Sequence, residues 1–336
     1  MIDTMVAAAR RGMPRRASGT SMPVVATRDD IAFVDGELPR AQVGTNPQHL
    51  LVTLFGDYWH GRTEHLPSAA LVEILADFGV SEPSTRAALN RLTKRGLFVS
   101  SKRGRNTYYG TEPSKLPLLL STFRRIVEFG GQRSRPWDGH WTLVAFSIPE
   151  SQRQLRHSVR THLRWLGFAA LYDGLWCSPW PDQDAAIEKL SELCVASSTV
   201  MRAEIDERSI VQALSAWDLG ALTDSYEAYG AEFAPILADA RRGALTTSEA
   251  LVARTKAMDE WRVFIGLEPD LPAELIPPDW PRARMRELAF ELHDSLAPAA
   301  QARCAQLIAK HAPELALLVT HQTAADLARL SLDDHR

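Results

Sequence analysis

The sequence predicts an α+β protein made of three successive parts: a helix-turn-helix followed by a β-hairpin, a domain that mixes strands and helices, and a helical carboxy-terminal domain. Three patterns support this fold class. Two short helical segments around a glycine turn lead into a strand-turn-strand segment, strand and helix spacings alternate after residue 136, and the spacing beyond Asp206 is helical. With 336 residues, 45% of them hydrophobic, the chain can bury two or three cores.

Charge is distributed unevenly along the chain. The net charge is −3, yet residues 1–135 hold 19 Lys and Arg against 12 Asp and Glu, a balance of +7 that leaves −10 for the remainder. The three cysteines, Cys177, Cys194 and Cys304, have neither zinc-site spacing nor a disulfide pattern, and no apolar run approaches the roughly 20 residues of a membrane helix. We therefore expect a cytoplasmic protein with no membrane span, metal or other cofactor.

Residues 1–45 have the composition of a disordered basic arm. They carry Arg10, Arg11, Arg15 and Arg16 among Gly, Pro, Ser and Thr, and no continuous apolar segment follows, which excludes a secretory signal. If the arm has a role, its charge suits contact with phosphate groups.

Three helices are predicted within residues 46–113, from apolar residues at helical spacing and from capping or turn residues at their ends. They cover Pro47 to Trp59, a segment that starts with Ser68 as N-cap and ends before Gly79, and Ser81 to Arg95. The third helix has clear end signals, because Ser81 is a preferred N-cap and Gly96 a preferred C-terminal stop.

A cationic β-hairpin follows the third helix. Leu97 to Ser101 and Thr107 to Tyr109 are strand-like, and Gly104 lies at the centre of the turn between them. From Ser84 to Thr111 the chain has seven Lys and Arg and no acidic residue, whereas a solvated surface normally mixes both signs. The helix pair and the basic hairpin together predict a winged helix-turn-helix that binds DNA.

The candidate DNA-binding residues lie on the third helix and at the hairpin tip. They are Ser84, Thr85, Arg86, Asn90, Arg91, Lys94, Lys102, Arg103 and Arg105. Arg86, Asn90 and Arg91 are the candidates for base contacts, because Arg and Asn can pair with guanine and adenine edges in the major groove; Lys94 and the hairpin cations are candidates for backbone contacts. The alternative interpretation is a well-solvated helix face followed by an ordinary hairpin.

Residues 114–136 are expected to form a connecting helix, from Ser114 to Phe129, and a linker. Residues 137–207 then have the order β-α-β-β-α-β, which is typical of a ferredoxin-like sandwich. The predicted segments are Trp141 to Ile148, a helix from Ser151 to Gly167, Phe168 to Leu171, Leu175 to Cys177, Asp182 to Val195, and Thr199 to Ile205. Asp173-Gly174 marks a hairpin turn.

Residues 208–336 are predicted to be mainly helical. The expected helices are Arg208 to Leu219, Ser225 to Arg241, one that starts at Thr246 with Glu249 completing a capping box, and Arg282 to Leu296. A proline-dense segment precedes the last helix and cannot itself be a helix or a central strand.

These pieces together resemble the PaaX family, transcriptional repressors of bacterial aromatic-acid catabolism. The resemblance covers the chain from about Pro47 to about Ile308, and the ordered set of matches is fairly specific although each one alone is weak. The matching segments are Ser84 to Leu92 with Arg95-Gly96 and Gly104-Arg105, Trp141 through Gly167, Leu175-Trp176-Cys177-Ser178-Pro179, Trp261-Arg262, Pro269 to Pro272 and Pro277 to Pro281. The arm before about Thr45 is longer than expected for the family.

The resemblance implies a winged-helix reader, a middle domain similar to the Cas2 ferredoxin fold, and a carboxy-terminal domain for effector binding and dimerisation. It also implies a homodimer that binds a palindromic operator in double-stranded DNA of the nucleoid and is released by an acyl-CoA thioester such as phenylacetyl-CoA. Trp261 and Arg262 are candidate effector-binding residues, because such a ligand needs an apolar slot and cations, although buried Trp residues usually fill cores.

Two other classes of function remain open. A metal-dependent, Cas2-like nuclease is expected to carry an Asp at the end of the first strand, but this strand ends in Phe146-Ser147-Ile148-Pro149, and Asp173 is explained by its turn. No hydrolase, phosphate-loop or His-Glu-x-x-His motif occurs either, so we expect no enzyme and no catalytic or metal-binding residue. The second alternative is an adaptor whose winged helix binds protein instead of DNA.

Overall fold

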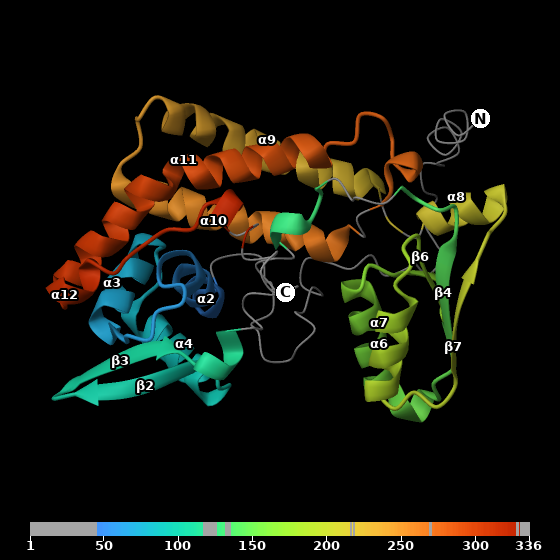
Figure 1. Ribbon diagram of the computed structural model, residues 1–336, viewed down its shortest axis with the longest axis horizontal. Coiled ribbons are helices and arrows are strands. Elements are labelled where there is room, and N and C mark those ends of the chain that lie inside the picture. Colours follow the sequence, from blue (N-terminus) through green and yellow to red (C-terminus); the bar gives the residue numbers. More distant parts are fainter. Residues whose placement is uncertain are drawn as a thin grey trace. The chain divides into compact units, whose positions relative to one another are not determined.

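The computed structural model describes residues 46–116, 126–131, 136–215, 217, 219–268, 271–326 and 329. It is a mixed helix and strand structure whose described part contains two small antiparallel sheets (Figure 1). The chain divides into two compact units, which we name after their sheets. The three-stranded unit comprises the described residues of 46–131, 228–263 and 283–329, and the four-stranded unit those of 136–227 and 264–282.

The amino-terminal part of the three-stranded unit contains the predicted helices and hairpin. The helices are α2 (Pro47–Tyr58), α3 (Ser68–Asp77) and α4 (Glu82–Lys94), and the strands are β1 (Leu66–Pro67), β2 (Phe98–Arg103) and β3 (Asn106–Thr111) in the order β1-β3-β2. Leu51, Leu75 and Leu89 are fully buried between the helices. The predicted start of α3 was wrong by one residue, because Pro67 and not Ser68 occupies its N-cap position.

The predicted connecting helix lies largely outside the described residues. At its start, Pro113–Lys115 forms one 3-10 turn, and at its end Ile126 and Phe129 are buried. Arg286 donates to the carbonyl oxygens of Val127 at 2.8 Å and of Phe129 at 3.1 Å. The end of this segment is therefore fixed within the core of the three-stranded unit.

Three long helices and a short one come from the carboxy-terminal third of the chain. They are α9 (Leu219–Arg241), α10 (Thr247–Leu267), α11 (Arg282–Ala309) and α12 (Pro313–Ala316). The predicted capping box is present, since Glu249 accepts hydrogen bonds from the backbone and the hydroxyl of Thr246. The expected end of α11 at Leu296 was wrong: the helix continues through Pro298, because buried Ala300, Cys304 and Leu307 extend its apolar face.

The four-stranded unit has the predicted β-α-β-β-α-β order. Its elements are β4 (Trp141–Phe146), α6 (Arg153–Trp165), β5 (Ala169–Tyr172), β6 (Leu175–Ser178), α7 (Gln183–Glu192) and β7 (Ser198–Ala203), with a 3-10 turn at Glu150–Gln152. The sheet is antiparallel with the order β5-β6-β4-β7, so β4 and β6 are central.

Each face of this sheet is buried against different parts of the chain. α6 and α7 cover the face of Val144, Phe146 and Trp176. On the other face, Trp141 and Cys177 pack against α8 (Glu207–Ser215) and against the segment that contains the 3-10 turn Ala273–Leu275. The proline-dense segment is therefore core-forming even though it is neither α-helix nor strand.

The two compact units do not coincide with the consecutive segments expected from the sequence. The segment 208–336 contributes to both, since 264–282 belongs to the four-stranded unit and 283–326 to the three-stranded unit. No helix among the described residues combines the length and the apolar character needed to span a membrane.

Candidate nucleic-acid interface

α4 has one buried face and one exposed polar face. Ala88, Leu89 and Leu92 are fully buried, whereas Arg86, Asn90, Arg91 and Lys94 are exposed as predicted. The helix begins at a capped end, where the Ser81 hydroxyl oxygen accepts a hydrogen bond from the Ser84 amide at 3.4 Å. The buried leucines therefore fix α4 in its unit and direct its polar face to solvent.

Two details of α4 differ from the expected surface. Thr85 is fully buried and its hydroxyl donates to the carbonyl oxygen of Ser81 at 3.2 Å, so its side chain supports the start of the helix and does not face a ligand. Arg86 is ion-paired with Glu82 at 2.7 Å, with both side chains about half exposed. Such a pair is worth at most about 1 kcal/mol in water, so Arg86 can exchange this carboxylate for another anion at little cost.

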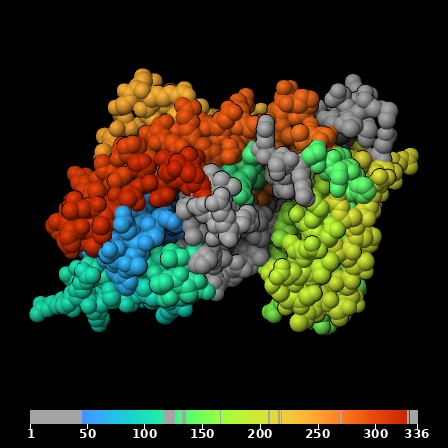
Figure 2. All heavy atoms as spheres, viewed as in Figure 1, coloured from blue at the N-terminus to red at the C-terminus, as the bar shows by residue number. Residues whose placement is uncertain are grey.

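The β2–β3 hairpin presents the second group of cations. β2 and β3 pair without interruption up to Arg103 and Asn106, and Gly104 in the turn has a φ of 61°, a conformation that glycine adopts without strain. Lys102, Arg103 and Arg105 are exposed at this tip, which projects from its unit (Figure 2). Arg103 also lies over the ring of Tyr108, with its guanidinium carbon 5.0 Å from the ring centroid.

His65, the residue directly before β1, contacts the hairpin, and the sequence did not reveal this contact. Its Nδ1 lies 2.8 Å from the Ser101 hydroxyl of β2, and a Cβ atom on Gly110 would come within 2.4 Å of its ring. Burial, and then the neighbouring Arg103 cation, lower the pKa of His65, which keeps the ring neutral at pH 7. No local pattern marks this contact because its three residues are far apart in the sequence.

Ion pairs join the helices behind this surface to α10 and α11. Arg254 of α10 donates to Asp57 of α2 at 3.0 Å, and both side chains are buried. Arg303 of α11 binds both carboxylate oxygens of Asp77 on α3, at 2.7 and 2.9 Å. The surface formed by α4 and the hairpin therefore belongs to the same compact unit as these carboxy-terminal helices.

The two candidate effector residues occupy packed positions. Trp261 is fully buried and its ring contacts those of Phe129, Tyr229 and Phe290. Arg262 is ion-paired with Asp259 at 3.3 Å and contacts His49 of α2. Trp261 thus fills the core, and the charge of Arg262 is compensated within the protein, so the structure gives neither residue an exposed ligand-binding surface.

The residues weighed for nuclease chemistry have structural roles. β4 ends at Phe146, two residues before the predicted end at Ile148, and no Asp follows it before Pro149. Asp173 accepts a hydrogen bond from Arg160 of α6 at 2.7 Å next to the β5–β6 turn. Within the described ranges, no three His, Cys, Asp or Glu side chains gather as possible metal ligands.

Comparisons with known proteins cover most of the chain. Three protein-family models match the chain. Residues 46–111 match the model described as PaaX-like protein, residues 134–214 the model of the PaaX protein central Cas2-like domain, and residues 217–306 the model of the PaaX-like protein C-terminal domain. The chain belongs to the PaaX family. The family's central Cas2-like domain spans all four strands of the four-stranded unit.

Two relatives of this PaaX-family chain are informative. The transcriptional repressor PaaX of Escherichia coli (strain K12) is 28% identical over 262 residues, which are 75% of this chain and 81% of the repressor. The solved structure of an uncharacterized protein, Rv0674 from Mycobacterium tuberculosis, has a TM-score of 0.52 at 24% identity and covers 77% of this chain and 98% of its own. The second likeness concerns the fold alone.

Proposed function

We propose that this PaaX-family chain is a DNA-binding transcriptional repressor that uses a winged helix-turn-helix. The observation that carries the proposal is the exposed and mainly basic surface of α4 and the hairpin tip, set on a buried core. In this assignment α3 and α4 are the helix-turn-helix and β2–β3 is the wing. The choice of a repressor is supported by the E. coli relative of that name.

The proposed contacts divide between bases and backbone. α4 lies in the major groove, where Arg86, Asn90 and Arg91 reach base edges. Ser84 and Lys94 on α4, together with the wing cations, hold the phosphates; the wing cations are Lys102, Arg103 and Arg105. Thr85 is left out of this set because its side chain is buried.

The finer parts of the proposal concern assembly and control. The protein binds a palindromic operator as a homodimer. Each DNA-binding domain contacts one half-site, and the two half-sites lie about one helical turn, or a multiple of it, apart. The effector is an acyl-CoA thioester such as phenylacetyl-CoA, the regulated genes are those of aromatic-acid catabolism, and the protein acts at the nucleoid in the cytoplasm. Family resemblance supports these points. An effector that prefers a second conformation lowers DNA affinity by linkage, typically by about 1 to 3 kcal/mol.

The direct test is a gel-shift titration on the DNA upstream of the protein's own gene. Arg91→Ala is expected to weaken binding by about 1 to 3 kcal/mol, roughly 5- to 150-fold, and to relax the choice of base, because it removes a base contact. Arg105→Ala is expected to weaken binding to all sequences alike, because it removes a phosphate contact.

Arg284→Ala is the matched control, since Arg284 is exposed on α11 and is not one of the proposed contact residues, so this variant should leave affinity unchanged. If Arg91→Ala and Arg105→Ala bind as tightly as the wild type, the repressor assignment is wrong. An absence of DNA binding by the wild type favours the protein-binding adaptor.

A further inference from the structure

The hairpin of β2 and β3 extends past the third strand of its sheet. β1 ends at Pro67, which is paired with Tyr108, so residues 102–107 continue beyond it as a two-stranded hairpin (Figure 1). The three wing cations lie in this extension and are exposed. If the hairpin moves freely, its cations lose freedom when they bind DNA, and this loss weakens binding. A contact that holds the hairpin close to these cations therefore bears on the proposed function.

His65 makes such a contact. Its Nδ1 lies 2.8 Å from the hydroxyl of Ser101, the residue directly before Lys102. The backbone next to His65 is anchored to the helices, because the buried Trp59 at the end of α2 donates from Nε1 to the carbonyl oxygen of Glu64 at 2.7 Å. The imidazole thus connects an anchored segment with β2, the strand that carries two of the wing cations.

Gly110 of β3 leaves the space that the His65 ring occupies. A Cβ atom at this position would lie 2.4 Å from Cδ2 and 2.9 Å from Nε2 of the ring. Gly110 is buried, and its φ is outside the left-handed region that favours glycine. The missing side chain therefore serves the packing of the ring and not an unusual backbone conformation. Because the ring lies against β3 and reaches β2, it contacts both strands of the hairpin.

The His65 ring and a wing cation are on the same face of the hairpin. Ser101 is paired with Tyr108, and Arg103 is two residues further along β2, so all three side chains share one face. Arg103 lies over the Tyr108 ring there, 5.0 Å from its centroid. Burial, and then the Arg103 cation, lower the pKa of His65. The ring is therefore neutral at pH 7 and adds no charge of its own to the wing.

We propose that His65 is a positioning residue for DNA binding. It holds the wing at Ser101 and Gly110, so that the cations of the wing reach the phosphates without first having to be ordered. A hairpin held in advance avoids the loss of affinity that ordering a flexible segment causes. The proposal rests on the proposed function, because His65 has this role only if the wing binds DNA.

A thermodynamic cycle on the upstream DNA tests this role in the full-length protein. His65→Ala should weaken binding roughly 3- to 10-fold in fluorescence-anisotropy titrations, because the hairpin must then be ordered on binding. The second background is a wing-neutral variant in which Lys102, Arg103 and Arg105 are all replaced by alanine. There His65→Ala should weaken binding less than about 2-fold, because it acts only through these cations. An equal loss in both backgrounds overturns the proposal.

Gly110→Ala tests the packing of the ring. Alone, the added Cβ should displace the His65 ring and weaken binding about as much as His65→Ala does. In the His65→Ala background it should have little further effect, because the clash is gone. His65→Asn should recover most of the affinity, since its amide can keep the hydrogen bond to Ser101. If Gly110→Ala binds like the wild type, or His65→Asn as weakly as His65→Ala, the ring does not position the wing in this way.

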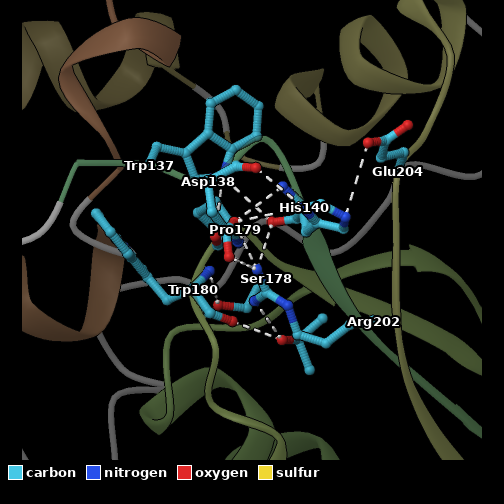
Figure 3. Close-up of polar contacts among 9 residues, drawn as sticks. Trp137, Asp138, His140, Ser178, Pro179, Trp180, Arg202 and Glu204 are labelled. Carbon is cyan, nitrogen blue, oxygen red and sulfur yellow. Dashed lines mark hydrogen bonds and ion pairs between the residues drawn. The ribbon is translucent and has the colours of Figure 1, made fainter.

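Arg202→Ala controls for a general loss of stability. Arg202 donates to both oxygens of Asp138 at 2.6 Å and to the carbonyl oxygen of His140 at 3.3 Å (Figure 3), and all three residues belong to the four-stranded unit. The variant should unfold at a lower temperature in circular dichroism, yet bind DNA as the wild type does at the temperature of the titration. If it loses as much affinity as His65→Ala, lost stability explains both results and the proposal is wrong.

The outcomes also separate the positioning role from the proposed function. If the wing-neutral variant binds more weakly than the wild type but His65→Ala does not, the wing contacts DNA and only the role of His65 is wrong. If the wing-neutral variant binds as tightly as the wild type, the assignment of the wing is wrong and the role of His65 is excluded with it.

Discussion

Arg254 is a buried cation that makes three hydrogen bonds to separate parts of the three-stranded unit. Its Nη1 donates to Asp57 at 3.0 Å, its Nε to the carbonyl oxygen of His293 at 2.9 Å, and its Nη2 to that of Gln322 at 2.7 Å. Burial by itself raises the pKa of Asp57, but Arg254 and His293 outweigh it and bring that pKa below its ordinary value. The pair is therefore ionised at neutral pH, and each partner depends on the other.

Replacing Arg254 should destabilise the protein severely. Arg254→Met leaves the Asp57 carboxylate buried without its main cation, which typically costs about 3 to 5 kcal/mol. Urea unfolding followed by circular dichroism measures this loss.

Arg241→Ala is the comparison for this measurement, because Arg241 forms an exposed ion pair with Glu291 between α9 and α11. Its unfolding free energy should stay within about 1 kcal/mol of the wild type. If both variants lose the same free energy of unfolding, the buried Arg254–Asp57 pair contributes no more to stability than an exposed ion pair.

At the scale of elements, α3 is bound to α11 by two neighbouring sets of ionic contacts. Arg303 binds both oxygens of Asp77, and Glu73 accepts hydrogen bonds from Lys310 at 2.7 Å and contacts His311 at 2.8 Å. The hydrogen bonds from Arg303 lower the pKa of Asp77, and those from Lys310 and then His311 lower the pKa of Glu73. The first helix of the proposed helix-turn-helix is therefore attached to the carboxy-terminal part of the chain.

The Asp77 contact predicts a defined pH dependence. Because its pKa is lower in the folded protein than in the unfolded chain, the carboxylate stabilises the fold above the unfolded pKa of about 4, and this stabilisation is lost as the pH falls through the lowered value. Asp77→Asn should lower the unfolding free energy by roughly 1 to 3 kcal/mol at pH 7, and the difference from the wild type should shrink below about pH 4. Urea titrations across this pH range measure it, and a difference that is constant with pH contradicts the assignment.

The sequence predicted the helix ends and turns that depend on neighbouring residues. Ser81, Gly104 and the Thr246 to Glu249 capping box are at the positions that the sequence indicated, because each acts on residues within a few positions of itself. The end of α11 was missed because buried side chains beyond Pro298 outweigh the local signal of the proline. The His65 contact with Gly110 was also missed, since it depends on how separate elements pack.

At the scale of the whole molecule, the sequence predicted the exposed cations of the candidate site but not the division of the chain. Arg91 and Lys94 are exposed because their helical positions are opposite Leu89 and Leu92, which is a local consequence of helix geometry. For Trp261 the sequence left two roles open, ligand binding and core packing, and the contacts of its ring place it in the core. The sharing of the last third of the chain between two compact units depends on distant contacts, which no periodicity reveals.

The uneven distribution of charge along the sequence is compatible with DNA binding. Residues 1–135 carry +7 and the rest −10, and the exposed cations of α4 and the hairpin belong to the basic part. An overall charge of −3 therefore does not argue against binding to a polyanion, because the field that DNA meets is the local one.

The most direct test of DNA binding by this surface is the salt dependence of affinity, measured by fluorescence anisotropy on labelled upstream DNA. We expect a linear fall of log affinity with log salt, amounting to roughly 10³-fold between about 50 and 200 mM if at least six phosphates are bound. Replacing Lys102 and Arg105 together by alanine should make the slope shallower by about one unit for each phosphate that is no longer neutralised. An affinity that does not change with salt, or a slope that is the same in this double variant, would show that α4 and the hairpin do not bind DNA through phosphate contacts.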